Sequence, residues 1–329
     1  MSDLVPSPEI SLPGGIRLVA AGQAATIRVP ATSANLGPGF DTLGLAVSLF
    51  DTVTVRTTTS GAVTVRVTGE GAGDLPTDET HLVARTLLDT LERSGFGCPG
   101  LELEAENLIP HGRGLGSSAA AIVSAVLAAN FLLPDTDRMD PAGLLQLCST
   151  LEGHPDNVAP ALLGALAISW ETGRVFRSAS VPVDPTIIPV AAIPASSLST
   201  ETARALLPAS VSHSSAAANA GRAALLVHAL SRQPEFLLDA TQDALHQDYR
   251  AQAMLPSATL MRQLRAQGFP AVISGAGPTV MAFAVGEQQA SEIERVIAEL
   301  TAATGPDQDW RVLRLAVESH GATLHPGHT

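Results

Sequence analysis

A glycine-rich loop followed by an apolar stretch constrains this chain most: residues 110–120 read PHGRGLGSSAA, and an alanine-rich run continues to Leu133. Glycine lets a backbone adopt positive φ angles and approach a ligand closely. The apolar run predicts a buried helix whose first N–H groups and positive dipole end face the loop, an arrangement suited to phosphate. A plain turn before a helix is the alternative. Ser117 and Ser118 favour the phosphate interpretation, since one hydroxyl can bind magnesium while the other contacts phosphate. We therefore expect a nucleoside triphosphate as ligand.

The absence of lysine narrows the class of nucleotide-binding protein. All 19 residues in the Lys+Arg count are arginines. Walker A loops and protein kinases require a lysine, and so do Schiff-base chemistry and pyridoxal phosphate attachment. The sequence excludes these four classes, so phosphate must be held by backbone amides, hydroxyls, magnesium and arginine.

Composition indicates an ordinary globular protein with one large or two smaller domains. The chain has 329 residues, of which 45% are hydrophobic and 16% charged, and its net charge of −13 argues against nucleic acid as a partner. Cys98 and Cys148 fit no metal or redox spacing and are expected to be reduced, buried thiols. The sequence shows no membrane span and no leader, which favours the cytoplasm.

Apolar spacing predicts mixed strands and helices in two α+β domains joined near residues 173–185. Residues 1–22 are rich in Pro, Ser and Gly and predict a flexible or loosely packed extension. Valines on either side of Ser60-Gly61 predict a hairpin of residues 53–55 with 63–67. Further strands are expected at 25–30, 101–105, within 181–193, beside the loop 274–279 and at 310–317. Helices are expected at 82–91, 119–133, 140–152, 156–163, 214–230, 235–246, 257–267 and 287–301.

Four other segments carry candidate chemistry. The loop 30–44 is polar and rich in glycine, and its Asn35 and Asp41 could bind a small hydroxylated substrate or only form Asx turns. In residues 152–157, Glu152 could reach magnesium, Asp156 could be only a helix N-cap, and His154 could be a surface histidine. Arg204 and Arg250 suit a carboxylate or phosphate, or are solvated charges. The loop 274–279 is either a lid edge or a tight connection between strands.

Together these segments resemble the GHMP small-molecule kinases, named for galactokinase, homoserine kinase, mevalonate kinase and phosphomevalonate kinase. The loop 110–120 is similar to the second superfamily motif, and the loop 274–279 to the third. The segment PATSANLGPGFDTLG at 30–44 resembles the first motif of the homoserine kinase family, as do HPDNVAP at 154–160, the segment 199–204 and Tyr249-Arg250. The resemblance covers residues 24 to 320.

The resemblance implies ATP-dependent phosphorylation of L-homoserine to O-phospho-L-homoserine, a step toward threonine. It implies that Arg204 and Arg250 hold the substrate carboxylate, that Asp41 meets its hydroxyl end, and that Asn35 and His154 also contact it. Thr200 would lie near the transferred phosphoryl group. Asn157 stands where relatives of the mevalonate kinase type carry an aspartate, which fits transfer without a protein base.

The same resemblance assigns the nucleotide and the metal. Magnesium would be held by Glu152 with Ser117 or Ser118, and Glu152 lies closer to His154 than in some relatives. Arg113 would contact the nucleotide or face solvent. The triphosphate would be cradled by Pro110, His111, Gly112, Arg113, Gly114, Leu115, Gly116, Ser117, Ser118, Ala119 and Ala120.

The expected fold is a two-domain α+β GHMP kinase with the active site between the domains. Residues 23–175 would form an ATP-binding domain like domain 2 of ribosomal protein S5, and residues 176–329 a ferredoxin-like C-terminal domain. A kinase for another hydroxyl substrate, such as mevalonate, and a catalytically silent binding protein are the rival interpretations. A homodimer is left open.

Overall fold

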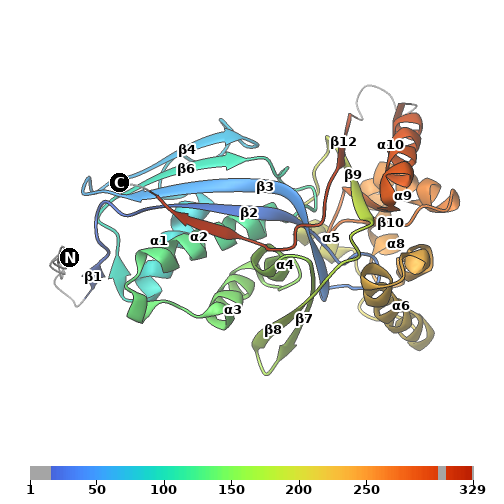
Figure 1. Cartoon of the computed structure of the whole chain (residues 1–329), viewed down its shortest axis with the longest axis horizontal. Coiled ribbons are helices and arrows are strands. Elements are labelled where there is room, and N and C mark those ends of the chain that lie inside the picture. Colours follow the sequence, from blue (N-terminus) through green and yellow to red (C-terminus); the bar gives the residue numbers. More distant parts are fainter. Residues whose placement is uncertain (1–15, 303–308, 328–329) are drawn as a thin grey trace.

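The computed structural model describes residues 16–302 and 309–327. It has two lobes, each a sheet covered by helices (Figure 1). The N-terminal lobe has a seven-stranded sheet in which β13-β2-β3-β6-β4 form the main path, while β7 pairs with β3 and with β8. Its strands are β2 (Ala24–Ala34), β3 (Leu43–Thr57), β4 (Val63–Gly69), β6 (Leu101–Asn107), β7 (Leu166–Thr172), β8 (Val175–Val181) and β13 (Thr323–Pro326).

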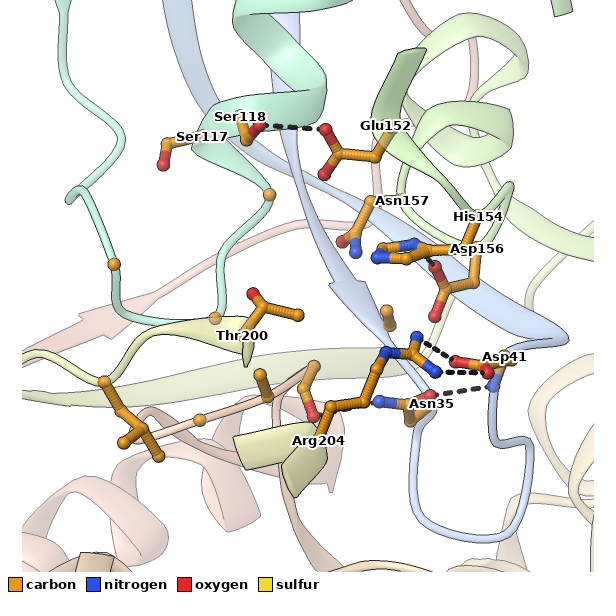
Figure 2. A pocket seen from close by; sticks show the side chains of 18 of the residues that line it. Asn35, Asp41, Ser117, Ser118, Glu152, His154, Asp156, Asn157, Thr200 and Arg204 are labelled. Carbon is orange, nitrogen blue, oxygen red and sulfur yellow. Dashed lines mark hydrogen bonds and ion pairs between the residues drawn. The ribbon is translucent and has the colours of Figure 1, made fainter. Parts of the chain in front are cut away.

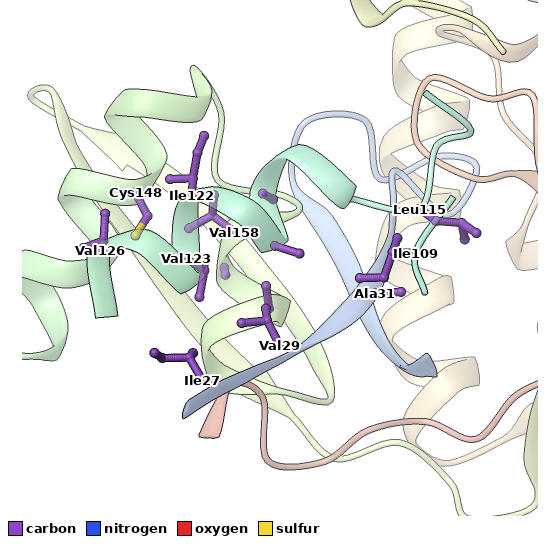
Figure 3. Close-up of a cluster of buried hydrophobic side chains, with 14 of the residues drawn as sticks. Ile27, Val29, Ala31, Ile109, Leu115, Ile122, Val123, Val126, Cys148 and Val158 are labelled. Carbon is purple, nitrogen blue, oxygen red and sulfur yellow. The ribbon is translucent and has the colours of Figure 1, made fainter. Parts of the chain in front are cut away.

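One face of this sheet is covered by helices α1 (Leu82–Arg93), α2 (Ser117–Leu132), α3 (Pro141–Glu152) and α4 (Val158–Leu163). Helix α2 is apolar along nearly its whole length, as a helix buried on several sides must be. Its Val123 points toward Ile27 and Val29 on β2, whereas Ile122 and Val126 lie on the side of Cys148 (Figure 3). This packing places the N-terminus of α2 at the end of the lobe that meets the C-terminal lobe.

The C-terminal lobe has an antiparallel sheet in the order β10-β11-β9-β12. Helices α9 (Leu255–Ala266) and α10 (Gly286–Ala302) pack on it around a second hydrophobic core. The strands are β9 (Ile187–Pro194), β10 (Ala271–Ile273), β11 (Val280–Val285) and β12 (Trp310–Arg314). The remaining helices of this half are α5 (Thr200–Ala205), α6 (His213–Ser231), α7 (Leu237–Ala240) and α8 (Gln247–Arg250).

Most predicted elements are confirmed, but the hairpin at Ser60-Gly61 is wrong. Strand β6 lies between β3 and β4, antiparallel to β3 and parallel to β4. Its residues alternate between buried and exposed, so one face of the strand packs on the helices. Its backbone pairs with a strand on each side, which places it inside the sheet. The helix expected over 235–246 is also shorter: α7 ends at Ala240, and an irregular segment leads to α8.

The chain divides between the lobes differently from the predicted domains. Residues 1–15 of the predicted extension lie outside the described residues, whereas Arg17–Leu18 form β1, paired with β5 (Phe96–Gly97), and Val19 is buried. The predicted boundary at 175/176 cuts β8, which belongs to the N-terminal sheet. Strand β13 also returns to that sheet beside β2. Segments near both ends of the described residues, β1 and β13, therefore belong to the N-terminal lobe.

Candidate active site

Most of the predicted site residues meet in one cleft between the lobes, with a cavity of about 120 Å³. Figure 2 shows Ser117, Ser118 and Glu152 at one end and Asn35, Asp41 and Arg204 at the other. Asn157, His154, Asp156 and Thr200 lie between the two groups. The glycine loop and the loop 274–277 contribute backbone to the lining. After the ligands that the resemblance implies, we call the first group the phosphate end and the second the amino-acid end.

At the phosphate end, glycine is required at two positions. Gly114 has φ +72°, and a Cβ there would lie 2.2 Å from the carbonyl oxygen of Ser274. Gly116 is the N-cap of α2 with φ +73°, and a Cβ there would lie 2.0 Å from Thr32 Oγ1. The first intrahelical bond is from Ala120 N–H to Gly116 O, which leaves the N–H groups of residues 117–119 for an anion.

Hydrogen bonds from outside the loop hold it in place. Arg113 donates to the carbonyl oxygens of His111 and Ala195, at 2.6 Å each, so its side chain fastens the loop to the C-terminal lobe. Arg113 is half-buried, and its expected contact with the nucleotide stays a prediction. Ser274 Oγ donates to Gly114 O at 2.6 Å, so the loop 274–279 is a tight connection that braces the phosphate end.

Asp51 braces the start of the same loop. Its Oδ1 accepts the backbone N–H of Leu108 at 2.7 Å and of Ile109 at 2.9 Å. Burial raises the pKa of Asp51 from 3.8 to about 6, against the lowering effect of these two hydrogen bonds. The carboxylate of Asp51 therefore holds the backbone just before Pro110, although burial disfavours its charged form.

Glu152 and Ser118 form the oxygen pair expected at a metal site. Ser118 Oγ donates to Glu152 Oε2 at 2.8 Å (Figure 2). Burial raises the pKa of Glu152, while the hydrogen bond from Ser118 lowers it. Carboxylate and hydroxyl oxygens together with phosphate oxygens suit Mg²⁺, so the donor set fits that ion. Of the two serines, Ser118 is the one that contacts Glu152.

His154 and Asp156 form a dyad in the middle of the cleft, with Nδ1 and Oδ1 2.5 Å apart. Burial lowers the pKa of His154, but the hydrogen bond and charge of Asp156 and the charge of Glu152 raise it, and the net shift is upward. The dyad therefore favours the protonated imidazole. Asp156 is not the N-cap of α4, because Asn157 occupies that position without a side-chain cap.

The amide of Asn157 is oriented by Thr32 on β2. Thr32 Oγ1 donates to Asn157 Oδ1 at 2.8 Å, which turns the Asn157 NH₂ group away from Thr32. Thr200, the first residue of α5, faces the same part of the cleft (Figure 2). Sequence reasoning missed Thr32 as a site residue, although it stands within the 30–44 motif.

At the amino-acid end, Asp41 and Arg204 form a bidentate ion pair. The two Nη atoms lie 2.9 and 2.8 Å from Oδ2 and Oδ1 (Figure 2). Asn35 Oδ1 accepts the Asp41 backbone N–H at 2.9 Å, and Asn35 Nδ2 donates to Gly275 O at 2.9 Å. Both polar groups of Asn35 are thus bonded to backbone, and one of these bonds holds Asp41 in place; the expected contact of Asn35 with substrate stays a prediction.

Arg250 enters the cleft from α8 and is only 2% exposed. Its guanidinium donates to the carbonyl oxygens of Ala203 and Gly275 and contacts His246 Nδ1 at 3.3 Å. Burial lowers the pKa of Arg250, and the charge of Arg204 lowers it further. The alternative of a solvated surface charge is wrong for Arg250, whereas Arg204 stays partly exposed at 41%.

A second cavity of about 190 Å³ adjoins the phosphate end and shares Ser117 and Ser118 with the cleft. Its walls include Val53, Leu75 and Leu82. His111 lies there too, and burial lowers its pKa. In contrast, Leu115, Ala119 and Ala120 are buried in the hydrophobic core, so within the predicted phosphate loop they contribute backbone only.

In residues 16–302 and 309–327, no three His, Cys, Asp or Glu side chains are grouped as a metal site. Over the same ranges no helix has the length and hydropathy to span a membrane.

Comparison with known proteins gives consistent family matches over both lobes. Residues 81–165 match the family model "GHMP kinases N terminal domain", and residues 217–305 match "GHMP kinases C terminal". A homoserine kinase from Streptomyces avermitilis is 50% identical over 304 residues, covering 92% of this chain and 96% of that protein. A homoserine kinase from Clavibacter michiganensis is 48% identical over 306 residues, covering 93% and 95%.

Solved structures with the same arrangement are also found. The crystal structure of a homoserine kinase from Cytophaga hutchinsonii superposes with a TM-score of 0.81 at 28% identity, covering 92% of this chain and 97% of that chain. A putative homoserine kinase from Listeria monocytogenes gives a TM-score of 0.73 at 29% identity, covering 92% and 100%. The two-lobed arrangement is therefore the GHMP kinase fold.

Proposed function

The chain belongs to the homoserine kinase family of GHMP kinases, and we propose how its cleft divides the work of this reaction. The enzyme is an ATP-dependent phosphotransferase that phosphorylates the side-chain hydroxyl of homoserine, a step of threonine biosynthesis. The product is O-phosphohomoserine. One observation supports placing ATP at one end of the cleft and homoserine at the other. A site for anions built from backbone N–H groups lies at the first end, and a cluster of charged side chains lies at the second.

ATP would lie along the phosphate end. The N–H groups of residues 117–119 would bind its phosphates, and the second cavity would take its base against Val53, Leu75 and Leu82. Glu152 and Ser118 would hold Mg²⁺, which neutralises phosphate charge when bound. Because Arg113 and Ser274 fasten the loop, this end needs little rearrangement to bind ATP.

The amino-acid end would hold the α-carbon of homoserine. Arg204 and Arg250 would bind its carboxylate, and Asp41 its ammonium group. We propose this role for Asp41 in place of the expected contact with the hydroxyl end, because Asp41 pairs bidentately with Arg204, the residue proposed to bind the carboxylate on the same carbon. Homoserine carries an ammonium and a carboxylate group on its α-carbon. On binding it would replace the Asp41–Arg204 pair by an ammonium–Asp41 pair and a carboxylate–Arg204 pair. Mevalonate has a carboxylate but no ammonium group and would leave Asp41 unpaired, which disfavours it.

Between the two ends, the homoserine hydroxyl would meet the γ-phosphoryl group near Asn157, His154 and Thr200. Thr32 holds the Asn157 carbonyl oxygen, so Asn157 would offer N–H donors to oxygen atoms of the reacting groups. A protonated His154, stabilised by Asp156, would add positive charge nearby. We propose transfer by positioning and electrostatics, without a protein base.

The test is ADP release with ATP and magnesium in the presence of L-homoserine, mevalonate or no acceptor. Release that depends on homoserine is the expected result. Release with mevalonate alone would keep the kinase and overturn the substrate. Absence of release with either acceptor would favour the silent binding protein.

We also propose a cytoplasmic location, supported by the free thiols of Cys98 and Cys148 and by the use of ATP. Light scattering of the purified protein would test the homodimer, which stays a prediction.

A further inference from the structure

Arg250 is a buried cation whose contacts are all neutral. Its Nε donates to Ala203 O at 3.2 Å, and its Nη1 contacts Gly275 O at 3.4 Å and His246 Nδ1 at 3.3 Å. Among the described residues, no carboxylate forms an ion pair with it. A buried charge is normally paired, and leaving it unpaired costs stability. Its positive charge is therefore available to a ligand that enters the cleft.

His246 is completely buried, and its two ring nitrogens have distinct partners. Nε2 lies 2.8 Å from the carbonyl oxygen of Gly37, which can only accept, so Nε2 carries the proton. Arg250 can only donate, so Nδ1 must be unprotonated to accept from it. These two contacts require the neutral Nε2–H tautomer.

The carboxylates nearest to this pair are already engaged. Asp243 lies 3.8 Å from His246 Nε2, beyond hydrogen-bond distance, and accepts the backbone N–H groups of residues 245–247. Asp41 is bound by Arg204. A neutral aromatic ring, Phe40, lies between the two arginines, with its centroid 5.3 Å from Arg250 Cζ and 5.6 Å from Arg204 Cζ. The surroundings of Arg250 thus hold the guanidinium without neutralising it.

We propose that His246 is a positioning residue for homoserine: as a neutral acceptor it orients Arg250 and leaves its charge to the substrate carboxylate. This rests on the proposed clamp of Arg204 and Arg250. A carboxylate in the place of His246 would satisfy the same hydrogen bond but neutralise Arg250 before substrate arrives. Neutrality at this position, as well as shape, would then determine affinity for the amino acid.

The test compares three substitutions at one position. In His246→Asn and His246→Asp, a side-chain oxygen can replace Nδ1, and the two variants differ in charge and in the NH₂ donor that Asn keeps. We expect His246→Asp to raise the KM for homoserine roughly tenfold to a hundredfold, while His246→Asn stays within about threefold of wild type. His246→Leu removes the acceptor and should raise this KM more than His246→Asn does. The KM for ATP should be unchanged in all three.

L-Homoserinamide lacks the carboxylate, so its KM should be the same in the His246→Asp and His246→Asn variants. Equal KM values for homoserine in these two variants would overturn the role of neutrality, and equal values in Leu and Asn would overturn the role of the acceptor. The Leu and Asn pair keeps the test decisive where the Asp variant does not fold. If Arg250→Ala leaves the KM for homoserine unchanged, the clamp itself is wrong; if it raises that KM and the His246 series does not respond, only this inference fails.

Discussion

The two ends of the cleft are built from different materials. The phosphate end uses backbone N–H groups and glycines, and side chains such as Arg113 and Ser274 hold the loop from outside. The amino-acid end uses charged side chains from distant parts of the chain, and two of them, Asp41 and Arg204, already bind each other. In the proposed function, the phosphate end is therefore ready for ATP, whereas the amino-acid end exchanges an internal ion pair for the charges of the substrate.

The largest effect is expected where a side chain would spoil the backbone of the phosphate end. Gly114→Ala places a Cβ 2.2 Å from Ser274 O at φ +72°, so the loop must move away from the loop 274–277. We expect kcat/KM for ATP to fall by about a hundredfold or more, since misplacement of about 1 Å costs that much. Steady-state kinetics with saturating homoserine measure it.

Gly268→Ala is the matched control for this strain. Gly268 has φ +89° and nothing within 4 Å of an added Cβ, and it follows α9 far from the glycine loop. It should lose about 1 kcal/mol of stability and leave both KM values unchanged. Equal kinetic losses in the two variants would show that general backbone strain, not the shape of the phosphate end, determines ATP binding.

The next largest effect is expected at the amino-acid end. Arg250→Ala removes a buried charge-assisted contact and should raise the KM for homoserine by up to about a hundredfold, with little change in the KM for ATP. Arg265→Ala is its control, because Arg265 likewise donates to buried carbonyl groups but lies outside the cleft. An equal rise in both KM values for Arg250→Ala would contradict a carboxylate clamp.

The phosphate end could be predicted from sequence because its parts are neighbours in the chain. The glycines, the serines and the apolar helix behind them stand within residues 110–133, and their spacing carries the geometry. Glu152 and the start of α4 are also neighbours in the chain, within residues 152–158, so a local motif could indicate them. A loop motif does not reveal which side chains turn into the core, as those of Leu115, Ala119 and Ala120 do.

The amino-acid end depends on contacts that no local pattern encodes. Asp41 and Arg204 are 163 residues apart, and His246 reaches Gly37 across 209 residues. The same limit explains the wrong hairpin: strand alternation indicated β3 and β4 correctly, but the insertion of β6 between them is a property of the whole sheet. Family resemblance predicts Arg204 and Arg250 as substrate residues, and only the structure shows which residues hold them.

A smaller effect sharpens the contrast between stability and binding. The side chains of Asp41 and Arg204 are 35% and 41% exposed, so their pair should contribute less than about 1 kcal/mol to stability. Asp41→Asn should therefore unfold almost as wild type in urea, yet raise the KM for homoserine about tenfold through loss of the ammonium contact. A large loss of stability without a change in this KM would make the pair a structural link between the lobes.

The smallest effect is expected midway between the two ends, at Asn157. Asn157→Asp keeps the acceptor for Thr32 Oγ1 and replaces the N–H donors by a second acceptor, placing negative charge near the phosphoryl group. If transfer proceeds by positioning alone, the new carboxylate brings no benefit as a base, and kcat should fall by about threefold as one neutral hydrogen bond is lost. Single-turnover measurements with saturating substrates separate this chemical step from product release. A large increase in kcat would mean that proton removal limits the reaction, and that the enzyme lacks a base it could use.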